Sequence, residues 1–140
     1  MSRNSQPSTH NPQKEDTIVA LATPNGVGAI GVIRLSGPDA IAIANSVFKG
    51  KDLEKQASHT IHFGNIVDAG VVLDEVLASV FIAPRSYTRE NVVEVSCHGS
   101  AYIMESIIKL FIKQGARSAK PLPSSFSLRD AATGYLKCVW

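Results

Sequence analysis

The sequence is poor in cysteine, in net charge and in long apolar runs, and each shortage excludes a class of protein. It has only two cysteines, Cys97 and Cys138, and no C-x-x-C pair, so neither a disulfide framework nor a zinc site is expected. A formal net charge of +2 gives no sign of a nucleic-acid binder. No run reaches the roughly eighteen apolar residues that a membrane-spanning helix needs.

The first fifteen residues also lack a targeting signal. They are polar, with no apolar core of a secretory signal and a single arginine, so residues 1–15 are expected to form a disordered leader. Together with the scarce cysteines, this favours a reducing, cytoplasmic location away from membranes. What remains is an ordinary globular composition, with 44% hydrophobic residues in 140, enough for one core.

Apolar periodicity predicts the element order β-β-α-β-β-β-α-β. Strands are expected over residues 16–23, 29–37, 59–68, 71–84 and 92–99, helices over 40–48 and 100–115, and a last extended piece from 116. Ser36 or Gly37 is the expected cap of the first helix. The second helix presents Ile103, Ile107, Leu110 and Phe111 at helical spacing and ends at Gly115. We therefore predict an α+β fold, a mixed sheet with helices packed on one face.

Gly26, Gly28 and Gly31 match the dinucleotide-binding pattern G-x-G-x-x-G. A phosphate site of this kind needs a helix that starts at the second or third glycine. The residues after Gly31 are instead strand formers, so the glycines indicate a loop between two strands of a hairpin. A P-loop is excluded more firmly, because no Gly-Lys-Ser/Thr follows.

Two charged residues lie in the middle of apolar strands. Strand alternation places Arg34 on one face with Val32 and Ser36, and it places Glu94 on one face with Ser96 and His98. An ionised group there is costly unless it is paired or holds a ligand. One interpretation is an ion pair that keeps two strands in register; the other is a polar pocket on one face of the sheet.

The remaining reactive side chains give weaker signals. Cys97 and His98 point to opposite faces of one strand, so Cys97 is expected in the core rather than in a catalytic dyad. His59 and His62 should also face opposite sides, which argues against a metal site. The Asp74-Glu75 pair is expected on a bent or irregular edge and is assigned no acid–base role. The loop "PRSYTREN" could line a pocket mouth or serve capping and solvation.

Two long motifs carry a family resemblance. "DTIVALATPNGVGAIGVIRLSGPDA" followed by "APRSYTRENVVEVSCHGS" resembles the N-terminal domain of the tRNA modification GTPase family MnmE, also called TrmE. The family shows ATP-x-G-x-G-x-x-x-R-x-SG and then P-x-SYT-x-E-D-x-x-E-x-x-CHGG. The resemblance runs in order over residues 16–120.

The resemblance implies a folate-binding fold related to the glycine cleavage T-protein. It implies that this domain homodimerises and binds a tetrahydrofolate derivative, 5-formyl- or 5,10-methylene-tetrahydrofolate. The folate-contacting arginine and glutamate of the family fall on Arg34 and Glu94. In the full-length family a helical domain and a GTPase domain follow. The GTPase domain uses GTP, Mg²⁺ and K⁺. With the flavoprotein MnmG, it adds an aminomethyl or carboxymethylaminomethyl group to the wobble uridine of tRNA.

Several positions depart from the family pattern. Val27 and Ala29 stand where the family often has arginine and glycine, and Ser100, a possible helix cap, replaces a glycine. Beyond Lys120 the pattern weakens, and Tyr135 occupies the position of a folate-site lysine. We expect a domain over 16–120 and a divergent or truncated tail over 121–140, with the helical and GTPase domains absent.

The chain alone is accordingly not expected to hydrolyse GTP or to modify tRNA. Two alternatives to a folate-binding domain remain open. One is a dimerisation module with a vestigial ligand pocket. The other is a stand-alone enzyme similar to an aminomethyltransferase, which the short chain and the lack of a well-placed catalytic acid disfavour.

Overall fold

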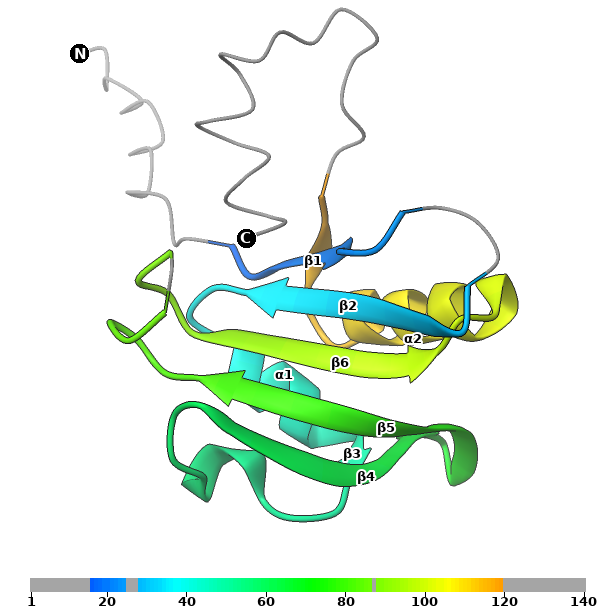
Figure 1. Cartoon of the computed structure of the whole chain (residues 1–140), viewed down its shortest axis with the longest axis horizontal. Coiled ribbons are helices and arrows are strands. Elements are labelled where there is room, and N and C mark those ends of the chain that lie inside the picture. Colours follow the sequence, from blue (N-terminus) through cyan, green and yellow to red (C-terminus); the bar gives the residue numbers. More distant parts are fainter. Residues whose placement is uncertain (1–15, 25–27, 87, 120–140) are drawn as a thin grey trace, which may run out of the picture.

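The structure, a computed structural model, describes residues 16–24, 28–86 and 88–119. The predicted leader, the tail and the loop positions Gly26, Val27 and Tyr87 lie outside these residues. The described part is a seven-stranded sheet with two α-helices (Figure 1). The α+β fold class is therefore confirmed.

The elements follow the predicted order. They are β1 (Ile18–Leu21), β2 (Ile30–Ser36), α1 (Ala40–Val47), β3 (Phe48–Lys49), the 3-10 turn η1 (Leu53–Lys55), β4 (Thr60–Asp68), β5 (Val71–Phe81), β6 (Val92–His98), α2 (Ala101–Lys113) and β7 (Arg117–Ser118). Their order in the sheet is β3-β4-β5-β6-β2-β1-β7. Neighbouring strands are antiparallel except β1 and β7, so the sheet is mixed, and β1 and β2 form the expected hairpin. The two-residue β3 and the turn η1 are additions to the prediction.

One face of the sheet forms the core. In β2 and β6 the residues Ile33, Leu35, Val93 and Val95 are 0–1% exposed, while the intervening Val32, Arg34, Glu94 and Ser96 are only partly buried. This period of two follows from the pleat, which sends successive side chains to opposite faces. Both helices lie behind the sheet in Figure 1, so one face is covered and the other is open.

Helix α2 buries a stripe slightly different from the expected one. Met104 joins Ile107, Leu110 and Phe111 in the core, whereas Ile103 is only partly buried. Gly115, at φ +115°, follows the last helical residues, and its N–H donates to Ile112 O while the Ala116 N–H donates to Phe111 O. This pair of bonds is a Schellman motif, so the predicted helix end is confirmed. Within the described residues, no helix is both long and apolar enough to cross a membrane.

Helix α1 begins later than the expected cap. Its N-cap is Asp39, whose side chain makes no capping bond; its backbone N–H donates instead to Thr17 Oγ1 over 2.9 Å. The expected cap Ser36 is the last residue of β2 and donates to Glu90 Oε2. The prediction of Ser36 or Gly37 as cap was wrong: the N-cap is Asp39, and Thr17, just before β1, accepts the hydrogen bond from its backbone N–H.

The glycine pattern serves packing. Gly31 lies inside β2, nine residues before α1, so the predicted strand, and not a helix, follows the glycines. A Cβ at Gly31 would collide with Met104 Sδ of α2, and one at Gly99 would collide with the backbone of Gly28. These glycines therefore let the β2 end of the hairpin approach α2 and β6 closely.

Candidate functional site

Arg34 and Glu94 meet on the open face of the sheet. They are direct partners in the antiparallel register of β2 and β6, two neighbouring interior strands of the sheet. Arg34 Nη2 donates to Glu94 Oε1 in an ion pair whose side chains are 11% and 27% exposed. The structure thus brings together the two charges that the sequence singled out, and the pairing interpretation is confirmed.

The pair leaves part of the arginine unsatisfied. Arg34 Nε and Nη1 are buried and have no hydrogen-bond partner. A guanidinium has five N–H donors in a fixed fork, and buried donors are nearly always paired. The unpaired edge is therefore suited to a carbonyl, carboxylate or ring-nitrogen acceptor from a ligand.

Small polar side chains flank this ion pair on the same face. Ser79 of β5 is in register with Glu94, and Ser96 of β6 is in register with Val32. Both serines are partly exposed. A ligand acceptor placed at Arg34 would therefore lie among hydroxyl groups and not against the apolar core.

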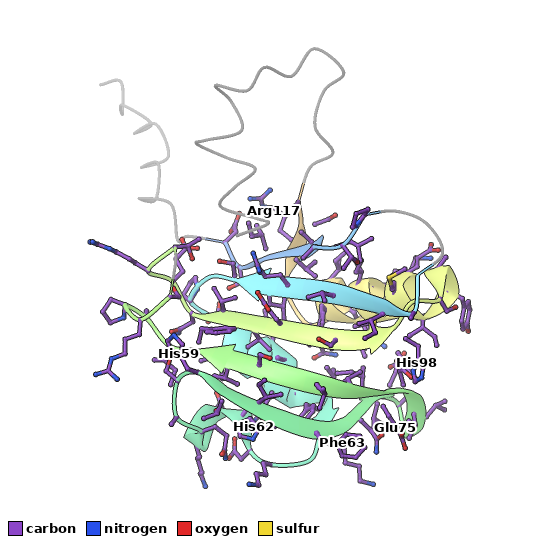
Figure 2. All side chains as sticks on the ribbon, in the orientation of Figure 1. His59, His62, Phe63, Glu75, His98 and Arg117 are labelled. Carbon is purple, nitrogen blue, oxygen red and sulfur yellow. The ribbon has the colours of Figure 1, made fainter. Side chains whose placement is uncertain are left out.

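A pocket of about 320 Å³ opens further along the same face, at the end of β6. It is lined by Ala29, Ile30, Phe63, Glu75, Val76, Leu77, Ser96, Cys97 and His98. Figure 2 shows His98, Glu75 and Phe63 at this end of the sheet. Arg34 and Glu94 are not among the lining residues, but Ser96, two residues along β6 from Glu94, lines the pocket on the side of the pair.

The sequence interpretation missed the role of Asp74. Asp74 was expected on a bent or irregular edge. The register of β4 and β5 does shift there, between Ile66 and Val67, but β5 is an interior strand and Asp74 is 8% exposed. Its Oδ2 accepts from the His98 backbone N–H over 2.8 Å, and its Oδ1 lies 2.6 Å from His98 Nδ1. The signal was present, because Asp74 is a carboxylate inside an apolar strand, as Glu94 is.

Cys97 is a core residue, as expected. It is 4% exposed, and its Sγ donates weakly to Gly31 O. Burial raises the pKa of the Cys97 thiol to about 11, with the nearby Asp74 charge adding to the rise and a backbone hydrogen bond opposing it. A protonated thiol whose neighbouring imidazole contacts Asp74 is no nucleophile, so the structure agrees with the rejection of a Cys–His dyad.

The other predicted polar residues serve local structure. His62 is buried in β4 with its Nε2 2.8 Å from Thr60 Oγ1, while the exposed His59 lies before the strand and meets the edge of Phe81. The two histidines therefore do not share a site. In the loop after β5, Ser86 Oγ donates to Glu90 O, which favours the capping interpretation of that loop.

Comparison with known proteins decides the family. The family model described as "GTP-binding protein TrmE N-terminus" matches residues 17–132. The chain belongs to the TrmE N-terminal family. Proteins called tRNA modification GTPase MnmE are similar to it: one from Cytophaga hutchinsonii is 53% identical over 85% of this chain, and one from Flavobacterium johnsoniae is 55% identical over 87%. A third, from Streptococcus pyogenes, is 57% identical over 76%.

The TrmE N-terminal chain spans about a quarter of the length of these curated relatives, 24–26% in the three cases. The family match extends to residue 132, past the point where the motif resemblance weakens. The residues of the pair and of the pocket all lie within the matched range.

Proposed function

We propose that this chain is the tetrahydrofolate-binding, homodimerising N-terminal domain of a GTPase that modifies the wobble uridine of tRNA. Family membership and the names of the relatives support the tRNA modification GTPase. In this proposal GTP hydrolysis, with its Mg²⁺ and K⁺, belongs to the remaining three quarters of such a protein. The flavoprotein MnmG and tRNA are partners of that full-length protein.

The observation that carries the folate assignment is the half-satisfied guanidinium of Arg34. Its two buried, unpaired donors fit a carbonyl or carboxylate of a reduced folate. Glu94 holds the guanidinium in place and offers its remaining acceptor capacity to the N–H groups of a pterin ring. When bound, the folate would supply the one-carbon unit; the residues described here would bind and orient it.

Isothermal titration with 5-formyltetrahydrofolate tests this assignment. We expect Arg34→Met and Glu94→Ala to weaken binding by at least about tenfold, because each removes a charge-assisted contact. Glu54→Ala, at an exposed carboxylate of η1, is the matched control and should bind like the wild type. Equal affinities for the wild type and both site variants would remove the pair from the ligand site.

A dimerisation module with a vestigial pocket is the second candidate function. It is favoured by one observation, that Arg34 and Glu94 already neutralise each other without a ligand. Sedimentation velocity with and without 5-formyltetrahydrofolate separates the two. A dimer that neither binds nor responds to the folate would favour the module, and a dimer that binds it would favour the folate-binding domain.

A further inference from the structure

The loop that joins β5 to β6, residues 82–91, lies at the end of the sheet where β2 ends (Figure 1). Ser36 of β2 and Val92 of β6 are partners in register at this end, and Ser36 shares the open face with Arg34, two residues before it. On a bare sheet both would be open to water, yet they are only 2% and 6% exposed. Ser36 Oγ donates to Glu90 Oε2 of the loop over 2.9 Å, so the loop is part of the cover beside the ion pair.

Hydrogen bonds hold this β5–β6 loop in one conformation. Ser86 Oγ donates to Glu90 O, and the Arg89 backbone N–H donates to Ser86 O over 3.1 Å. The Ala83 N–H donates to Asn91 Oδ1 over 2.9 Å. Arg89 adopts φ +60°, which a residue with a side chain occupies mainly where its surroundings fix the backbone. The loop is therefore a fixed support for the side chains that it carries.

The β5–β6 loop carries two arginines, Arg85 and Arg89, and both are exposed. Among the described residues, the arginines in ion pairs are Arg34 and Arg117, and neither of the loop arginines has one. The family motif P-x-SYT-x-E-D leaves both of their positions unspecified, so they are not among the residues that define the family. The loop thus presents two guanidinium groups whose donors suit carboxylate or phosphate oxygens.

The opposite end of the open face favours the other sign of charge. The pocket at the end of β6 is lined by the exposed carboxylate of Glu75. The basic residue among those lining it, His98, already contacts the carboxylate of Asp74. A ligand with one anionic end, held at the ion pair between these two ends, would therefore point that end to the β5–β6 loop and away from Glu75.

We propose that Arg85 and Arg89 bind the glutamate end of the ligand held by Arg34 and Glu94, so that the site prefers reduced folates that carry several glutamates. This inference rests on the proposed folate function and deepens it. A folate joins its pterin ring through an aminobenzoyl group to glutamate, and each further glutamate adds a carboxylate. With the pterin at the ion pair, the glutamate chain runs along the β5–β6 loop. The two arginines determine specificity and take no part in one-carbon chemistry.

Isothermal titration of the whole chain with the monoglutamate and the pentaglutamate of 5-formyltetrahydrofolate tests the inference. We expect the wild type to bind the pentaglutamate about tenfold more tightly, because each exposed ion pair contributes only a few-fold. Ion pairs of this kind are screened by salt. The preference should therefore shrink to about twofold or less in roughly 1 M sodium chloride, where the Debye length is about 3 Å.

A double variant assigns the preference to the loop. Arg85→Gln combined with Arg89→Gln should remove the preference and leave the affinity for the monoglutamate within about twofold of the wild type. Lys49→Gln combined with Lys51→Gln is the matched control. It changes the net charge by the same amount at exposed lysines of β3 and the residues after it, at the far edge of the sheet, and should keep the preference.

The possible outcomes separate this inference from the folate assignment. Equal affinities of the wild type for the two forms overturn the inference and leave the folate assignment standing. Binding of neither form overturns the folate assignment and the inference with it. A preference that survives in the arginine double variant, or that is also lost in the lysine double variant, contradicts the role of the two loop arginines.

Discussion

At the scale of single residues, the Arg34–Glu94 pair places two opposite charges, only 11% and 27% exposed, in the middle of the sheet. Removing two charges from water costs more than their attraction returns unless hydrogen bonds complete both groups. Here the arginine is left incomplete, with two buried donors unpaired. A pair kept for stability alone would be expected to satisfy them, which is why the incompleteness argues for an external acceptor.

The pair can be tested by a double-mutant cycle. Glu94→Leu alone should lower the free energy of unfolding by about 2 kcal/mol, because it leaves the largely buried Arg34 charge unpaired. Arg34→Leu together with Glu94→Leu should recover most of that loss. Urea denaturation measures both. A single variant that costs no more than a surface pair, below about 0.5 kcal/mol, would contradict the coupling.

Cys97 gives a prediction with a defined pH dependence. The pKa of its thiol is raised from 9.0 to about 11 in the fold, so the unfolded chain loses this proton first as pH rises. The contribution to stability is therefore complete below pH 9 and is lost between pH 9 and 11. Unfolding free energies measured over that range should fall more steeply for the wild type than for Cys97→Ala. Parallel curves would show that the thiol does not titrate differently in the two states.

The burial of Cys97 also predicts slow alkylation of its thiol in the native chain. In a Cys138→Ser background at pH 8, iodoacetamide should leave the native chain unmodified and should alkylate it readily in urea. Mass spectrometry measures the extent of modification. Rapid alkylation of the native chain would contradict a buried, protonated thiol.

Which single residues could be anticipated depends on how far their partners lie in the sequence. Arg34 and Glu94 were visible because a charge inside an apolar strand needs a partner, and the alternation placed each on a definite face. Asp74 carried the same signal, but its meaning depended on the position of β5 within the sheet. The pairing of β5 with β6 is a tertiary fact, and only that pairing brings Asp74 to His98.

At the scale of elements, the end of α2 is the most strictly specified feature. Gly115 adopts φ +115°, a region that a side chain makes costly, and its Schellman bonds pass the chain into β7. Gly115→Ala should therefore lower the free energy of unfolding by about 1 kcal/mol. Gln114→Ala, at an ordinary φ of −84°, should be nearly neutral. Equal losses in thermal or urea unfolding would show that the glycine is not conformationally required.

The start of α1, in contrast, depends on a residue far away in the sequence. The apolar periodicity predicted that this helix exists. It did not predict the helix cap or the short strand β3 at which the helix ends. The donor at Asp39 is satisfied by Thr17, which precedes β1 and lies 22 residues earlier in the chain. Local rules for helix starts consider only the neighbouring residues, so they cannot predict a hydrogen bond to a side chain 22 residues away. The predicted element boundaries therefore differ from the observed ones wherever tertiary contacts replace local ones.

At the scale of the whole molecule, the sheet has one covered face and one open face. The open face bears Ile61, Phe63 and Leu77 on β4 and β5, each 45–66% exposed and adjacent in register. Exposed apolar side chains grouped in this way mark interaction surfaces rather than random exposure. In the proposed homodimer, this patch would meet the second copy.

The dimer prediction rests on Ile61, which lies on the patch but does not line the pocket. Ile61→Glu places a charge where the second copy would pack, so analytical ultracentrifugation should show a dimer for the wild type and a monomer for the variant. The melting temperature at low concentration should change little, because Ile61 is 66% exposed and contributes little to the core of one subunit. Tyr102→Glu, on α2 and 77% exposed, is the control and should remain dimeric. A wild-type monomer would contradict the proposed homodimer, and a dimer that survives Ile61→Glu would place the interface elsewhere.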